Sequence, residues 1–227
     1  MPFFCHEASL AASLAAQLKQ PGRIVGYALP VMRVLGVVGS PRRGGNTHKL
    51  VEAVLDGARS EGAEVELWLL RRLHIQECDG CHHCWTKGCC SKPDDMRDCY
   101  PKLAAFDALV LGTPVYWYGP TALMKGFLDR FVYFNCEPHR ALVRGKPVAL
   151  VVPFEDEDLE TARPLTMMFE KSLAYLEMPL VGRVLVPGVT ERGEVVNQSE
   201  AMRWAKRVGA ELVRGSAVDG TLGQAGP

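Results

Sequence analysis

Short apolar runs alternate with amphipathic segments along most of the chain, and this alternation predicts a sheet with helices. Residues 33–39 (RVLGVVG) form an apolar run that ends in a turn, which is typical of a strand buried on both faces of a parallel sheet. Further apolar runs at 107–112, 148–152 and 180–186 predict more buried strands. Residues 64–70 instead alternate between apolar and charged positions, which indicates an edge strand.

The segments between these runs carry apolar residues at helical spacing. Leu50, Val51, Val54, Leu55 and Ala58 recur in this way before Gly62 ends the pattern. Similar patterns occupy 122–134, 165–176 and 204–212. Strands that alternate with helices predict an α/β domain with a parallel sheet wound on both sides.

This domain is expected to span residues 32–214. Residues 215–227 are expected to form a disordered tail. Residues 1–31 precede the first convincing strand, so they are either an upstream extension produced by start-site choice or a helical arm packed on the domain or a partner. Whether they belong to the native protein stays open at this point.

The composition of the chain argues against several classes of function. The 227 residues include 26 Lys plus Arg and 26 Asp plus Glu, so the chain has no net positive charge that would attract nucleic acid. The longest apolar stretches are interrupted by Pro30 and Arg33 and are too short for a membrane span. The N-terminal stretch lacks a basic start and a cleavage site, so it does not indicate a signal peptide. We therefore expect a cytoplasmic protein without nucleic-acid or membrane partners.

The loop at residues 39–47 (GSPRRGGNT), called the phosphate loop below, follows the first predicted strand and precedes a helix. Doubly wound sheets bind ligands at such a position. Backbone N–H groups at the helix start, together with the side chains of Ser40, Arg42, Asn46 and Thr47, suit a phosphate monoester. The loop lacks the features of a triphosphate loop or a dinucleotide fingerprint. The alternative is an ordinary turn in which Asn46 or Thr47 caps the helix.

A second loop, residues 113–119 (TPVYWYG), is called the aromatic loop and follows the third predicted strand. It should lie beside the phosphate loop at the same sheet edge. Its aromatic side chains could stack on a flat ring, and its backbone could bond the polar edge of that ring. Packing in a core or at a dimer interface is the alternative. The candidate contacts are Pro114, Val115, Tyr116, Trp117 and Tyr118.

These two loops and the segment 123–130 (LMKGFLDR) together resemble the NAD(P)H-dependent FMN reductase and flavodoxin-like superfamily over about residues 32–190. The resemblance implies a flavodoxin-like, three-layer, doubly wound, five-stranded parallel sheet. It also implies bound FMN, NAD(P)H as electron donor and a small-molecule or protein electron acceptor, with the flavin carrying the chemistry and no catalytic acid or base. The acidic run at 153–158 departs from the glycine-richer segment of relatives, and we assign it no chemistry.

Cysteines cluster in the insertion after the second predicted strand. Cys78, Cys81, Cys84 and Cys90 have the spacing C-x2-C-x2-C-x5-C, and Cys89 competes with Cys90. Together with the following Pro93–Met96, the segment resembles the iron-sulfur flavoprotein branch of the family. A [4Fe-4S] cluster, zinc held with His82 or His83, and free thiols are all open alternatives. Cys5, Cys99 and Cys136 are isolated and predicted to be ordinary cysteines.

The sequence thus favours an FMN-dependent NAD(P)H oxidoreductase. One rival is an iron-sulfur flavoprotein whose cluster relays single electrons to FMN, and another is a flavin or metal sensor without turnover. We also expect a homodimer or tetramer, because the aromatic loop and Leu123, Phe127 and Phe131 would otherwise leave a large apolar surface in water.

Overall fold

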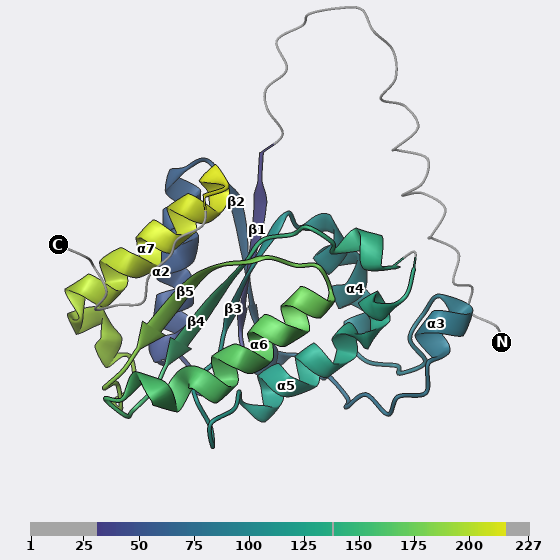
Figure 1. Cartoon of the computed structure of the whole chain (residues 1–227), viewed down its shortest axis with the longest axis horizontal. Helices are drawn as coiled ribbons and strands as arrows, with labels where there is room; N and C mark the ends of the chain where they lie inside the picture. Colours follow the sequence, from purple (N-terminus) through teal and green to yellow (C-terminus); the bar gives the residue numbers. More distant parts are fainter. Residues whose placement is uncertain (1–30, 138, 217–227) are drawn as a thin grey trace, which may run out of the picture.

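The computed structural model describes residues 31–137 and 139–216. They contain one sheet of five parallel strands in the order β2-β1-β3-β4-β5 (Figure 1). Each predicted run differs from its strand by at most one residue, so the predicted five-stranded parallel sheet is confirmed. The strands are β1 (Arg33–Val38), β2 (Glu64–Leu69), β3 (Ala108–Gly112), β4 (Val148–Pro153) and β5 (Leu180–Val186).

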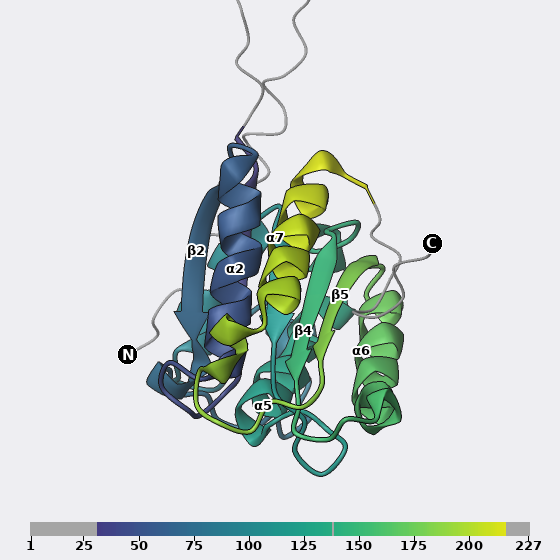
Figure 2. The same ribbon diagram turned by 90° about the vertical axis from the view of Figure 1, so that its left-hand side faces the viewer.

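Helices cover both faces of this sheet, as Figures 1 and 2 show. On one face lie α2 (Asn46–Ser60) and α7 (Ser199–Arg214). On the other lie α4 (Met96–Ala105), α5 (Ala122–Asp129) and α6 (Arg163–Tyr175), and α3 (His83–Lys87) belongs to the cysteine-rich region. The 3-10 helices are η1 (Leu70–Arg72), η2 (Arg130–Asn135), η3 (His139–Leu142), η4 (Leu159–Ala162) and η5 (Glu194–Asn197).

The pleat of the strands divides the core into two layers. In β1, Val34 and Val38 pack with α2 and α7, whereas Leu35 and Val37 pack with α4, α5 and α6. Because successive side chains of a strand point to opposite faces, a strand covered on both sides must be apolar throughout. This explains why the central strands read as unbroken apolar runs.

Two glycines bring α2 and α7 unusually close together. A Cβ atom added at Gly57 would lie 1.8 Å from the Lys206 carbonyl oxygen, and one added at Gly209 would lie 1.8 Å from that of Val54. No larger residue fits either position without separating the helices. This packing fixes α2, whose first turn follows the phosphate loop.

The prediction of exposed aromatic residues on α5 and η2 is wrong. Phe127 is fully buried and Phe131 is 4% exposed, because this face of the helix packs onto the sheet. Leu123 is half-buried. The predicted single helix over 122–134 is α-helical only to Asp129 and then continues as η2. The oligomer stays a prediction, now supported by the aromatic loop alone.

Some expectations lie outside the described residues. These are the N-terminal arm up to residue 30, Cys5 and the tail from residue 217 onward. Within the described chain, α7 ends at Arg214 and Gly215 follows it at φ 75°, a left-handed conformation that glycine adopts readily. None of the described helices is long and apolar enough to cross a membrane.

Candidate functional site

The phosphate loop joins β1 to α2 at the carboxyl edge of the sheet. Ser40 and Thr47 are buried, and the Ser40 Oγ accepts a hydrogen bond of 3.3 Å from the Arg42 N–H. No side chain caps the start of α2, and its first turn contains no acidic residue. The alternative, a helix cap by Asn46 or Thr47, is therefore not formed. The N–H groups and the positive end of the helix dipole suit an anion.

Two buried threonines tie the phosphate loop to the aromatic loop. The Thr121 hydroxyl donates to the Gly39 carbonyl oxygen at 2.5 Å and accepts from the Met124 N–H, so it also caps α5. The Thr121 N–H in turn donates to the Thr113 Oγ1 at 3.1 Å. These hydrogen bonds therefore link the two loops where they follow β1 and β3, at the carboxyl edge of the sheet. Flavodoxin-like sheets bind FMN at this switch point between neighbouring strands.

The aromatic loop folds back on itself as a tight hairpin. Tyr116 and Gly119 exchange both backbone hydrogen bonds, at 2.8 and 3.0 Å. Between them, Trp117 and Tyr118 have φ angles of 49° and 62°. Such a turn normally carries Asn and Gly, because a left-handed conformation strains larger residues. Trp117 is 96% exposed and Tyr118 59% exposed, so nothing in the described chain packs on these rings enough to explain the strain.

A third segment, residues 188–195, lies against the phosphate loop and is called the strap. The Arg42 Nη1 donates to the Thr190 carbonyl oxygen at 3.1 Å. The Asn46 side chain donates to the Glu191 carbonyl oxygen at 2.9 Å and accepts from the Val195 N–H at 3.2 Å. No local sequence pattern indicates the strap. Arg42 and Asn46, which are expected to bind a phosphate, thus also hold the backbone of the strap against the phosphate loop.

Two aspartates of the acidic run after β4 accept hydrogen bonds from neighbouring groups of the same turn. Asp156 accepts hydrogen bonds from the Thr161 hydroxyl and the Asp158 N–H, and Asp158 accepts one from the Glu160 N–H. The bond from Thr161 holds the pKa of Asp156 below its ordinary value. These are turn contacts of the kind Asp makes in loops.

The cysteine segment, residues 78–92, encloses a small cavity. Of the clustered thiols, Cys78, Cys81, Cys84 and Cys90 line it, and Cys89 is not among the lining residues. Its volume is about 20 Å³, room for about one water molecule. Burial and the neighbouring Cys90 thiol raise the pKa of Cys84 to about 11. Within residues 31–137 and 139–216, no three His, Cys, Asp or Glu side chains stand close enough to hold a metal ion.

The Trp85 side chain docks the cysteine segment onto the domain, and a buried ion pair lies directly after the segment. The Trp85 indole N–H donates to the Val132 carbonyl oxygen at 2.8 Å, and His82 stacks on Trp85 with ring centroids 4.1 Å apart. Arg130 and Asp94 form the ion pair, with side chains 1% and 0% exposed. Burial opposes ionisation of Asp94, but hydrogen bonds from Arg130 and Gln76 hold its pKa below the ordinary value. The helix α4 that follows, with Met96, Tyr100 and Leu103 buried, was not predicted.

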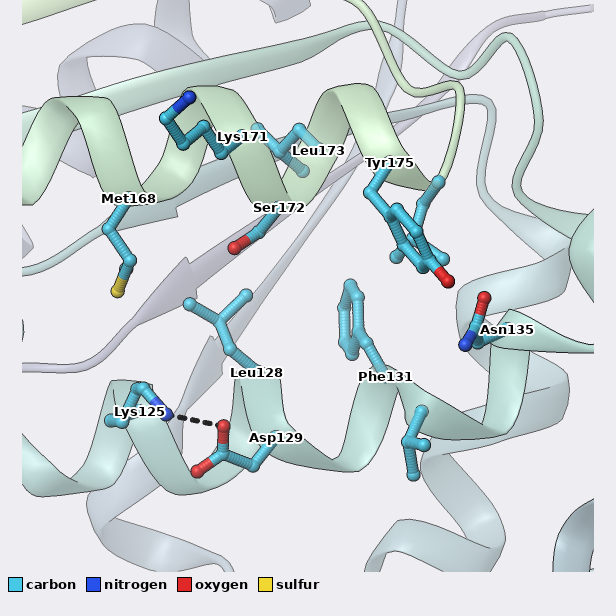
Figure 3. Close-up of a pocket in the computed structure, with 12 residues that line it drawn as sticks. Lys125, Leu128, Asp129, Phe131, Asn135, Met168, Lys171, Ser172, Leu173 and Tyr175 are labelled. Carbon is cyan, nitrogen blue, oxygen red and sulfur yellow. Dashed lines mark hydrogen bonds and ion pairs between the residues drawn. The ribbon is translucent and has the colours of Figure 1, made fainter. Parts of the chain in front are cut away.

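A separate groove lies elsewhere, between α5 with η2 and α6 (Figure 3). It has a volume of about 470 Å³, and neither the phosphate loop nor the aromatic loop contributes to its lining. Leu128 and Phe131 face Ser172 and Leu173 across it, and Lys125 pairs with Asp129 at its rim. The groove is therefore a different site from the strand ends, where the candidate flavin-binding residues lie.

The residues at the strand edge fit a flavin phosphate. Uncapped N–H groups, buried hydroxyls at Ser40 and Thr47 and a first turn free of acidic residues are the donor set that a phosphate needs. The cysteine cavity fits an iron-sulfur cluster in donor type, since four thiols face one space. As folded, that space has room for about one water molecule, and no three of the described thiols stand close enough to bind one metal ion, so the described geometry does not accommodate a cluster.

Comparison with known proteins agrees with this arrangement. An iron-sulfur flavoprotein of Archaeoglobus fulgidus is 37% identical over 115 residues, 51% of this chain and 51% of that protein. One from Methanocaldococcus jannaschii is 38% identical over 99 residues, 44% of this chain and 51% of that protein. The match thus spans about half the length of these curated relatives.

Among solved structures, an NAD(P)H:quinone oxidoreductase from Methanothermobacter marburgensis has a TM-score of 0.66 at 20% identity. The match covers 80% of this chain and 96% of that one. At this identity the likeness shows the fold alone. The family model for NADPH-dependent FMN reductase matches residues 32–188, which hold every strand, the phosphate loop, the aromatic loop and the cysteine segment. The chain belongs to the NADPH-dependent FMN reductase family.

Proposed function

We propose that the chain is an FMN-dependent oxidoreductase that uses NAD(P)H. The observation that carries the proposal is the uncapped N-terminus of α2 beside a strained, exposed aromatic hairpin at the β1/β3 edge. When bound there, FMN would supply hydride chemistry by accepting a hydride from NAD(P)H and passing electrons to an acceptor. The family assignment supports the same cofactor.

The protein residues would hold and orient the flavin rather than transfer protons. Ser40, Thr47 and the first N–H groups of α2 would bind its phosphate. The backbone of Pro114 and Val115 and the rings of Tyr116, Trp117 and Tyr118 would contact its ring system. Arg42 and Asn46 would add donors while they keep the strap closed over the loop. No catalytic acid or base is proposed.

Flavin content of purified variants tests the phosphate assignment. The double variant Arg42→Ala/Asn46→Ala removes charge and donors from the loop and its ties to the strap, so it should purify without FMN. Arg59→Ala is the matched control, because Arg59 lies in the last turn of α2, at the far end of the helix from the phosphate loop, and pairs with the exposed Asp56. Stoichiometric FMN in the double variant would refute the phosphate site.

Turnover separates the enzyme from a sensor without activity. The FMN-loaded protein should oxidise NADPH or NADH at steady state when an artificial acceptor such as a quinone is present. Bound FMN that is never reduced by either nicotinamide cofactor would favour the sensor.

The second candidate function is that of an iron-sulfur flavoprotein, in which a cluster held by the cysteine segment relays single electrons to FMN. The shared cavity of Cys78, Cys81, Cys84 and Cys90 supports it, as do the names of the relatives. Iron analysis after anaerobic purification is the test. Cys90→Ser should lose iron, whereas Cys89→Ser should keep it. Less than one iron per chain in the wild-type protein would remove this candidate.

We also propose a homodimer or tetramer in the cytoplasm, in which a partner subunit covers the exposed aromatic loop. The exposed fractions of Tyr116, Trp117 and Tyr118 support such a contact. Sedimentation at micromolar concentration should show a species of at least twice the monomer mass, and a clean monomer would count against it.

A further inference from the structure

The strap places an arginine beside the phosphate loop. Gly193 of the strap and Gly44 of the loop have φ angles of 78° and 63°, left-handed conformations that glycine adopts readily. A Cβ atom added at Gly193 would lie only 3.2 Å from the Gly44 carbonyl oxygen, so the two backbones are in close contact. Arg192 directly precedes Gly193, and its Nη2 lies 3.7 Å from the position of a Cβ added at Gly44. The guanidinium therefore lies within contact distance of the phosphate loop.

The Arg192 guanidinium makes no hydrogen bond or ion pair with the part of the chain that the structure describes. The neighbouring Glu194 carboxylate accepts the Glu191 N–H at 2.5 Å, so it closes a turn of the strap instead of pairing with the arginine. The start of α2 beside it has no side-chain cap and no acidic residue in its first turn. Positive groups that gather without a counter-charge favour an anion.

A buried hydroxyl in the same loop independently indicates a ligand. Thr47 is 2% exposed, and its methyl group faces Gly112 of β3, where an added Cβ would lie 3.0 Å from the Thr47 Cγ2. No group among the described residues bonds the Thr47 hydroxyl, although buried hydroxyls normally find a partner. The hydroxyl oxygen is not fully enclosed, so a ligand can reach it. An anion at the start of α2 would supply the missing partner.

The arginine of the phosphate loop is already partly engaged. The Arg42 Nη1 donates to the Thr190 carbonyl oxygen of the strap, so one end of its guanidinium is turned away from the loop. A phosphate monoester carries about two negative charges at neutral pH. One tied arginine and the partial charge of a helix start balance these charges incompletely. A second guanidinium beside the loop would complete the balance.

We propose that Arg192 is a further binding residue for the flavin phosphate, supplied by the strap. The inference rests on the proposed function, because it requires the phosphate loop to bind FMN. It also goes beyond the family assignment, since the family model ends at residue 188 and does not include Arg192. The strap thus contributes a charged donor of its own, besides being held in place by Arg42 and Asn46.

Titration of flavin-free protein with FMN and with riboflavin, followed by flavin fluorescence, tests the assignment in the wild type and three variants. Arg192→Gln removes the charge and the paired donors, whereas Arg192→Lys keeps the charge alone. Arg207→Gln is the matched control. Arg207 is exposed on α7 and lies over the Trp204 ring, and the adjacent Lys206 packs against Gly57, near the C-terminal end of α2. Thermal unfolding of the flavin-free proteins checks that the variants are folded alike.

We expect Arg192→Gln to lose about tenfold in FMN affinity and to stay within about twofold of the wild type for riboflavin, because the guanidinium contacts only the phosphate. Arg192→Lys should fall between these two proteins, and Arg207→Gln should match the wild type. An unchanged FMN affinity in Arg192→Gln, or an equal loss of FMN and riboflavin affinity, would overturn the role of Arg192 and leave the phosphate site intact. Equal affinities of the wild type for FMN and riboflavin would overturn the phosphate site itself.

Discussion

The strained turn of the aromatic loop gives a prediction in which stability and function change in opposite directions. Trp117 and Tyr118 both have left-handed φ angles, and this conformation costs roughly 1–2 kcal/mol for each residue with a side chain. Asn and Gly fit such a turn without this cost. The double variant Trp117→Asn/Tyr118→Gly should therefore be more stable than the wild type.

The size of the gain can be worked from the two residues. Relief of strain contributes about 2–4 kcal/mol, and the greater chain entropy of glycine in the unfolded state removes about 0.5–1 kcal/mol. Trp117 is 96% exposed, so little burial is lost with its ring. The free energy of unfolding should rise by about 2 kcal/mol, which raises the melting temperature by about 4–8 °C in a domain of this size.

Thermal unfolding of flavin-free protein, followed by circular dichroism, measures the gain, and FMN titration measures the loss. Without the two rings, FMN affinity should fall by about tenfold, the order expected from an aromatic contact of about 1.4 kcal/mol. Trp117→Ala is the control: it keeps an L-residue in the strained position and should leave stability within about 0.5 kcal/mol of the wild type. A double variant no more stable than the wild type would refute the account of strain.

Two further predictions concern the fold that carries the site. Gly57→Ala places a Cβ 1.8 Å from the Lys206 carbonyl oxygen, so urea unfolding should show a loss of about 1–3 kcal/mol; Gly126→Ala in α5, with nothing within 4 Å, should instead be neutral or slightly stabilising. Burial lowers the pKa of Lys146 to about 8 from 10.5. The unfolded chain then binds more protons between these pH values, so stability relative to Lys146→Met should rise with pH across pH 8–10.5. A flat difference would show that Lys146 is not desolvated.

The central strands could be predicted because burial on both faces forces them to be apolar, and the edge strand β2 because its apolar and charged residues alternate. The neighbouring positions of the phosphate loop and the aromatic loop could also be predicted, because the carboxyl ends of neighbouring parallel strands meet at one edge of the sheet. Helix α4 escaped prediction because Pro101 lies inside it, and proline normally argues against a helix interior. Phe127 was predicted to be exposed, although it is buried, because apolar spacing defines one face of a helix but does not tell whether the sheet or a partner subunit covers that face.

Long-range contacts of polar groups could not be predicted. Asn46 bonds the strap residue Glu191 across 145 positions, and Arg130 bonds Asp94 across 36. No local pattern encodes such pairs, because they depend on how the loops return over the finished sheet. The sequence could identify Arg130 only as part of a motif, and its contact with Cys90 needed the structure.

The most direct test of the flavin site is to titrate flavin-free protein with FMN and with riboflavin, which lacks the phosphate, by calorimetry. If the N-terminus of α2 and the phosphate loop bind the phosphate, FMN should bind at least 100-fold more tightly, because each hydrogen bond to a charged group contributes about 1.5–3 kcal/mol. Arg42→Ala/Asn46→Ala should bring the two affinities closer together. Equal affinities for FMN and riboflavin in the wild-type protein would contradict the account.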